Sequence, residues 1–161
     1  MQDPLLAETV NYVAIQRLLG AYADTVNRRA WNELGELFLG SARIEITPPR
    51  RDPIELEGPE ALGRFIADAI ARYEFFQFVF LNTRIEIRPD GDNATGRNYM
   101  CELRQEKASG RWTQVFGVYH DRFRRVDGRW WFEHRRFHAL AAPTRDALVF
   151  DFPGELQIDP L

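Results

Sequence analysis

All three histidines of the chain lie on either side of the dipeptide Asp127-Gly128: His120 precedes it, and His134 and His138 follow it. Long aromatic-rich runs flank this dipeptide, and an Asp-Gly pair in that setting is the strongest short-range signal for a tight β-hairpin. An imidazole is a candidate general acid or base because it changes charge near neutral pH. The predicted hairpin therefore holds the first candidates for chemistry.

The spacing of these histidines excludes a shared metal ion. Residues four apart on a strand are separated by roughly 13 Å at the usual rise per residue, so His134 and His138 cannot bind one metal together. The single cysteine, Cys101, excludes an intrachain disulfide and a multi-cysteine zinc cluster. We predict no metal and no cofactor.

The composition is that of a globular protein, and we expect one domain over 1–161. A length of 161 residues is enough to bury a core, and 45% of the residues are hydrophobic. The formal net charge of -3 provides no basic surface for nucleic acid. The sequence shows neither a signal peptide nor an apolar run long enough to span a membrane. We therefore expect a cytoplasmic protein without nucleic-acid or membrane partners.

The hydrophobic pattern changes from helical to strand-like along the chain. Apolar residues recur at helical spacing over 5–27, 30–38 and 60–73, and 42–46 alternates like a strand. Four long β-branched and aromatic runs follow, separated by short turns: 75–88, 94–107, 111–126 and 129–140. Short turns make neighbouring strands antiparallel. The predicted fold class is α+β, with three N-terminal helices packed on a strongly curved antiparallel sheet that forms a conical pocket.

Two segments resemble a known family. They are Y-A-D-T-V-N-R-R-A-W-N-E-L-G-E-L-F, over 22–38, and V-D-G-R-W-W-F-E-H-R-R, over 126–136. With the order of elements, they resemble the SnoaL-like branch of the nuclear-transport-factor-two-like superfamily, which includes polyketide cyclases, scytalone dehydratase and hexachlorocyclohexane dehydrochlorinase. The resemblance covers nearly the whole chain and implies a single SnoaL-like domain with the cystatin-like α+β cone. It implies no particular reaction, because this scaffold carries isomerases, dehydratases, cyclases, hydrolases and non-catalytic binders.

The acid–base pair of the dehydratase and the dehydrochlorinase is missing from this chain. In those enzymes an aspartate near the end of the first helix pairs with a histidine early in the first long strand. The resemblance assigns these two positions to Asn27 and Phe78, and a second histidine of the dehydratase to Arg104. Asn27 cannot accept a proton as a carboxylate does, and Phe78 cannot act as a base. We therefore expect a different mechanism.

The resemblance also implies which side chains line the cavity. Glu102 is the one carboxylate among them and the best candidate general base or acid. Arg135 suits an enolate, phenolate or carboxylate of the ligand, and Tyr119 can donate a hydrogen bond to a carbonyl. Asn27 can orient a hydroxyl or a water molecule. The candidate ligand-binding residues, most of them apolar, are Tyr22, Val26, Ile46, Phe78, Met100, Arg104 and Phe137.

The strand register around Glu102 has an alternative. Side chains alternate between the two faces of a strand, so a slip of one residue moves a whole set to the other face. Glu102 and Arg104 would then form a pair on a solvent-exposed face, and Cys101 and Leu103 would face inward.

The last predicted strand, 129–140, also allows two orientations of its side chains. By strict alternation His134 shares a face with Trp130 and Phe132, opposite to Arg135 and Phe137. A β-bulge between Phe132 and Arg135 would bring His134 to the cavity. His134 therefore stays a second candidate base.

Two kinds of function follow. The first is a cofactor-independent lyase or isomerase that abstracts a proton beside a carbonyl of a hydrophobic, cyclic, oxygenated metabolite, with Glu102 or His134 as base. The reaction would be an isomerisation, a dehydration or a cyclisation. The second is a non-catalytic ligand-binding protein, or the small subunit of an aromatic-ring hydroxylating dioxygenase, which shares this fold. The expected partners are a small hydrophobic organic ligand and, by resemblance, a second copy of the chain that pairs through the sheet.

Overall fold

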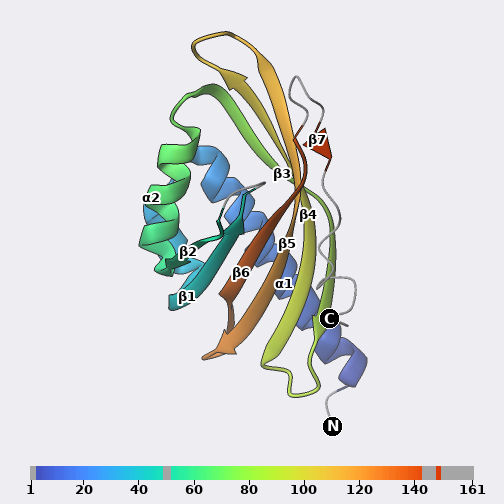
Figure 1. Cartoon of the computed structure of the whole chain (residues 1–161). Helices are drawn as coiled ribbons and strands as arrows, with labels where there is room; N and C mark the ends of the chain where they lie inside the picture. Colours follow the sequence, from blue (N-terminus) through green and yellow to red (C-terminus); the bar gives the residue numbers. More distant parts are fainter. Residues whose placement is uncertain (1–2, 49–51, 143–147, 150–161) are drawn as a thin grey trace.

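The computed structural model describes residues 3–48, 52–142 and 148–149. Figure 1 shows a long, curved sheet with the helices gathered on one of its faces. The elements are α1 (Pro4–Arg28), the 3-10 helix η1 (Trp31–Glu36), β1 (Phe38–Thr47), β2 (Ile54–Glu57), α2 (Gly58–Ile70), β3 (Tyr73–Ile87), β4 (Asn93–Glu106), β5 (Trp112–Val126), β6 (Arg129–Ala142) and β7 (Leu148–Val149). The predicted α+β class is confirmed.

The sheet is mixed, whereas the sequence predicted an antiparallel one. Strands β3, β4, β5 and β6 form the predicted antiparallel meander. Strand β1 joins it in parallel beside β6, and the order is β2-β1-β6-β5-β4-β3, with β7 also paired to β6. The parallel pair has no local signal in the sequence, because α2 and four strands separate its two members along the chain.

The three predicted helices are present, and the second is a single 3-10 segment. Helix α1 begins where the Asp3 carboxylate accepts a hydrogen bond from the Leu5 N–H at 3.0 Å, and it ends where Arg29 adopts a left-handed φ of 58°. Near its start Leu6 and Val10 are 57% and 58% exposed, and Asn11 accepts a hydrogen bond from the Trp130 side chain of β6 at 3.1 Å. The predicted apolar stripe is buried only from Ile15 onward. None of the helices in the described ranges is long and apolar enough to cross a membrane.

Tyr22, in the buried half of α1, lies at the centre of an aromatic core. Its ring makes edge contacts with Phe38 of β1, Phe78 of β3 and Phe132 of β6, with ring centroids 5.6–5.9 Å apart. Phe38 and Phe132 stack on each other at 4.6 Å. Such contacts hold the concave face of the sheet against α1.

A bulge at Glu133 resets the alternation of side chains along β6. Phe132 pairs with Phe123 of β5, but His134 pairs with Arg122, so the backbone of Glu133 has no counterpart in the register with β5. The extra residue brings Phe132 and Arg135 to the same, inner face. Strict alternation, which separated these two residues, was therefore wrong at this point.

The side chain of Asn27 joins the end of α1 to the edge of the sheet. Its Nδ2 donates to the Phe78 carbonyl at 2.9 Å, and its Oδ1 accepts from the Phe78 N–H at 2.7 Å. Because β3 is the last strand of the sheet, the outward backbone groups of Phe78 have no neighbouring strand to bind. The amide of Asn27 takes the place of the missing strand and fixes α1 against β3.

Replacement of Asn27 by alanine tests this role. Asn27→Ala removes both hydrogen bonds and leaves the N–H and C=O of Phe78 unpaired, so we expect a loss of about 1–3 kcal/mol in the free energy of unfolding. Urea denaturation measures it. Asn32→Ala, at an exposed position of η1, is the matched control and should leave the midpoint unchanged. Equal stability of Asn27→Ala and the wild type would show that the amide does not hold this junction.

Candidate active site

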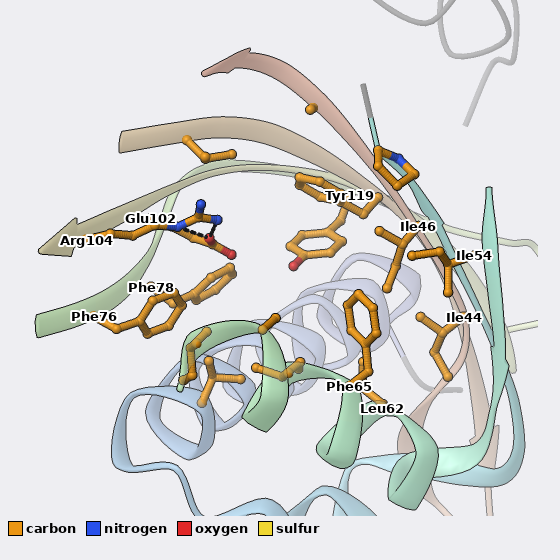
Figure 2. Close-up of a pocket in the computed structure, with 18 of the residues that line it drawn as sticks. Ile44, Ile46, Ile54, Leu62, Phe65, Phe76, Phe78, Glu102, Arg104 and Tyr119 are labelled. Carbon is orange, nitrogen blue, oxygen red and sulfur yellow. Dashed lines mark hydrogen bonds and ion pairs between the residues drawn. The ribbon is translucent and has the colours of Figure 1, made fainter. Parts of the chain in front are cut away.

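The concave face of the sheet and the two helices line a cavity of about 480 Å³. Its lining is mainly apolar, with side chains from α1, α2 and strands β1 to β6 such as Ile44, Leu62, Phe65 and Phe76 (Figure 2). A cavity of this size and character is typical of a site for a small organic molecule. The polar groups that line it decide its chemistry.

The structure brings together most of the residues that the sequence predicted for the site. The predicted residues that line the cavity are Tyr22, Val26, Ile46, Phe78, Glu102, Arg104, Tyr119, Arg135 and Phe137. The inward register of β4 holds, because Glu102 and Arg104 line the cavity whereas Cys101 and Leu103 do not. The alternative register, slipped by one residue, is therefore wrong.

Three predicted residues do not line the cavity. The side chain of Asn27 binds the Phe78 backbone instead. Met100 is fully buried in the hydrophobic core. His134 forms an ion pair or hydrogen bond with Glu45 of β1 at 3.0 Å, and burial holds the pKa of the imidazole below its ordinary value although Glu45 opposes this effect. The bulge predicted as a route for His134 into the cavity exists, but it turns Phe132 inward and leaves His134 beside Glu45.

Arg135 is a buried cation held by a buried carboxylate. Its Nε and Nη2 donate to the two oxygens of Asp121 on β5 at 2.7 and 2.8 Å, and the two side chains are 1% and 0% exposed. Asn98 of β4 donates to the same carboxylate at 2.6 Å. Burial would lower the pKa of the guanidinium, but the Asp121 charge raises it above its ordinary value. Arg135 is therefore a permanent positive charge.

One nitrogen of that guanidinium is unpaired. Nη1 of Arg135 is buried and has no hydrogen-bond partner in the part of the chain that the structure describes. The guanidinium lies over the rings of Tyr22 and Tyr119, at 4.1 Å from each centroid, and over Phe132 at 4.3 Å. A buried N–H donor without an acceptor is costly, so an acceptor on a bound ligand would relieve this cost.

Two phenol groups lie beside this cation. Burial raises the pKa of Tyr22 above its usual value, although the nearby positive charge of Arg135 opposes the effect. Burial raises the pKa of Tyr119 still more, with a contribution from Tyr22. Both hydroxyls therefore keep their protons at neutral pH and above, and both can donate hydrogen bonds. Figure 2 shows the Tyr119 ring within the cavity.

Glu102 and Arg104 form an ion pair at the cavity surface. The Nε of Arg104 donates to Oε2 of Glu102 at 2.9 Å, and its Nη2 binds the same oxygen. No described residue donates to the other oxygen, Oε1, and Figure 2 shows the carboxylate reaching into the cavity between Phe78 and Tyr119. The charge of Glu102 contributes to the raised pKa of both Tyr22 and Tyr119. Oε1 is thus a free acceptor close to the tyrosines.

The sequence reasoning missed Asp121 and all of the cavity residues on α2. Asp121 follows Tyr119 by two positions on β5, so alternation alone could have assigned it to the inner face. What alternation could not show is that Asp121 lies across from Arg135. That pairing depends on the turn and on the bulge at Glu133. The residues of α2 carry no functional signal, because an apolar stripe is equally a core-packing stripe.

The family model of the SnoaL-like domain matches residues 7–136. The chain therefore belongs to the SnoaL-like family, and its fold is that of the nuclear-transport-factor-two-like superfamily. A comparison with curated protein sequences gives no match.

Solved structures share this fold at low sequence identity. A protein assigned as a scytalone dehydratase from Novosphingobium aromaticivorans matches with a TM-score of 0.76 and 18% identity, over 92% of this chain and 96% of that one. The hexachlorocyclohexane dehydrochlorinase LinA-type3 from Novosphingobium barchaimii matches with a TM-score of 0.76 and 19% identity, over 92% and 99%. A protein assigned as an aromatic ring hydroxylase from Novosphingobium aromaticivorans matches with a TM-score of 0.68 and 23% identity, over 86% and 92%.

The positions that the resemblance assigned to the acid–base pair are neighbours in this structure. The Asn27 side chain touches Phe78, but the contact is with the backbone of Phe78. Neither an amide nor a phenyl ring transfers a proton under these conditions. The candidate catalytic groups Glu102, Tyr119 and Arg135 lie instead on β4, β5 and β6.

Removal of either member of the buried ion pair should destabilise the protein strongly. Arg135→Met or Asp121→Leu leaves one buried charge uncompensated, so each should cost about 3–5 kcal/mol of unfolding free energy. The double variant should cost less than the two single changes together, because no charge is then left alone. Urea denaturation of the four proteins measures the coupling.

An exposed arginine provides the control for this cycle. Arg64 of α2 is 72% exposed at its side chain and faces Glu60 at 3.8 Å. Arg64→Met should leave the denaturation midpoint unchanged, because exposed ion pairs contribute little. Additive effects of the two buried changes would contradict a coupled pair.

Proposed function

We propose that the protein is a cofactor-independent acid–base enzyme for a hydrophobic, cyclic, oxygenated metabolite. The reaction is abstraction of a proton beside a carbonyl group, and it leads to an isomerisation, a dehydration or a cyclisation. Membership of the SnoaL-like family and the apolar cavity support a small-molecule ligand. The polar groups of the cavity support this type of chemistry.

The observation that carries the proposal is the unpartnered Nη1 of the buried Arg135, whose guanidinium lies 4.1 Å from the ring centres of Tyr22 and Tyr119. Removal of a proton beside a carbonyl puts negative charge on the carbonyl oxygen. A fixed cation and neutral hydroxyl donors stabilise that charge, and they do so more strongly in an apolar cavity than in water. Two hydrogen bonds to Asp121 hold the Arg135 guanidinium in place, so the cation needs no rearrangement during the reaction.

Glu102 is the proposed base. Both bonds from Arg104 go to Oε2, which leaves Oε1 to accept a proton from the ligand. The carboxylate belongs to the same cavity as Tyr119 and Arg135. His134 is the weaker candidate, because it binds Glu45 and does not line the cavity.

A second candidate function is ligand binding without catalysis. It is favoured by Asn27 and Phe78, which occupy the places of the family's acid–base pair without its chemistry. The role of a small subunit beside a larger oxygenase belongs to this candidate. The subunit role is supported by the fold that this chain shares with the protein assigned as an aromatic ring hydroxylase.

We also propose a homodimer that pairs through the convex face of the sheet. Phe76 and Val115 line the cavity, so alternation puts Phe75 and Trp112 on the opposite face. Their rings lie 5.2 Å apart and are 38% and 59% exposed. Light scattering should give the mass of a dimer for the wild type and of a monomer for Trp112→Ser. A monomeric wild type would rule the dimer out.

Deuterium exchange tests the proposed reaction. The wild type should accelerate exchange of the α-protons of 2-tetralone, a cyclic aromatic ketone, in D2O as followed by NMR. Glu102→Gln should lower the enzymatic rate about 10²- to 10³-fold, because a general base contributes on that order. Its dissociation constant for the ketone should stay within a factor of two, since the side chain keeps its shape.

The control is Glu106→Gln, a change of the same kind on the same strand but outside the cavity, which should keep the full rate. A Glu102→Gln variant that retains the wild-type rate would remove Glu102 as the base. A wild type that binds 2-tetralone and never accelerates exchange would favour the binding protein.

A further inference from the structure

A second polar group lines the same cavity nearer to solvent. Arg72, which follows α2, is exposed, whereas Arg135 is 1% exposed, so Arg72 marks the mouth and Arg135 the floor. Between them in exposure lies Arg104, whose side chain is 22% exposed. Both outer arginines face Tyr73, with guanidinium carbons 5.0 and 5.2 Å from the centre of its ring.

The hydroxyl proton of Tyr73 is an unused hydrogen-bond donor among the described residues. Its oxygen accepts from Arg72 Nη2 at 2.7 Å and from Arg104 Nη1 at 3.3 Å. A phenol oxygen has two acceptor sites and one proton, so both acceptor sites are filled and the proton is left to donate. The structure gives it no acceptor among the described residues, and Tyr73 is 3% exposed and lines the cavity.

Among the residues that the structure describes, Arg72 has no carboxylate partner. Glu102 is paired with Arg104, and Glu106 accepts from Arg111 at 3.2 Å. Arg72 also lowers the pKa of Glu106, but as the smallest of the causes, after Ser109 and Arg111. Lys107 adds a further positive charge, held at the end of α2 by a bond to the Ala71 carbonyl at 2.9 Å. Arg72 is therefore a cation of the cavity lining that is available to an anionic group of a ligand.

We propose that the ligand of this cavity carries a carboxylate, which binds at the mouth against Arg72 and the Tyr73 hydroxyl. A guanidinium presents several N–H donors in a plane that matches a carboxylate, and the Tyr73 proton supplies one more donor. Arg104 binds the Tyr73 hydroxyl, and its own charge is neutralised by Glu102. This inference rests on the proposed function for the other end of the ligand.

The two ends of the cavity then bind two different groups of one ligand molecule. The carbonyl oxygen lies at the floor, against Arg135 and Tyr119, and the carboxylate lies at the mouth. The apolar lining between them accommodates a ring system. The substrate class is thus a cyclic keto acid, with its acid group away from the carbonyl that reacts.

A matched pair of ligands tests the inference by calorimetry. The probes are 2-acetylnaphthalene, which has the ketone alone, and 6-acetyl-2-naphthoic acid, which adds a carboxylate at the far end. The wild type should bind the acid about tenfold more tightly than the ketone, because a charged hydrogen bond at a partly exposed site contributes on that order. Arg72→Gln should remove this advantage and leave the affinity for the ketone within a factor of two.

Two more variants make the test specific. Arg72→Lys keeps the positive charge and should restore part of the advantage, and Arg64→Gln, which removes a positive charge from α2 outside the cavity, should retain all of it. Equal affinity of the wild type for both probes would overturn the inference, as would an Arg72→Gln variant that weakens both probes equally. If neither probe binds, the proposed function fails and this inference fails with it.

Discussion

The buried ion pair between Arg135 and Asp121 is the interaction on which the cavity depends. An arginine that is 1% exposed is tolerable only because Asp121, at 0% exposed, accepts two of its N–H groups and Asn98 supports that carboxylate. The arrangement uses every oxygen of Asp121 and leaves Nη1 of Arg135 without a partner. The pair is a costly way to stabilise a fold. It is an effective way to hold a cation at the floor of an apolar cavity.

Several features of the fold serve this placement. The bulge at Glu133 brings Phe132 and Arg135 to one face, so that the cation lies among the rings of Tyr22, Tyr119 and Phe132. Asn27 fixes α1 on β3, and α1 carries Tyr22. The position that the resemblance assigned to a catalytic aspartate thus joins α1 to β3 in this protein. The groups proposed for acid–base chemistry lie on strands β4, β5 and β6 of the meander.

The sequence predicted the elements well and their pairings only in part. Helical spacing and the Asp-Gly turn gave the helices and the four-stranded meander, and alternation gave the inward register of Glu102 and Arg104 because these signals are local. The parallel pairing of β1 with β6, the bulge at Glu133 and the partnership of Asp121 with Arg135 are not local. They depend on side chains that meet only after folding, and a pattern of residue types does not record them. The hydrogen bonds between Asn27 and the backbone of Phe78 were not predicted for the same reason.

The most direct measurement is the ionisation of a phenol bound in the cavity. Absorbance titration of bound 4-nitrophenol reports the pH at which it loses its proton. If Arg135, Tyr22 and Tyr119 stabilise an oxyanion, the bound phenol ionises at a lower pH than the free one. Burial in an apolar cavity alone would have the opposite effect and raise the pKa of the phenol. A lowered pKa is the predicted result, and a raised or unchanged pKa would contradict an oxyanion site at Arg135.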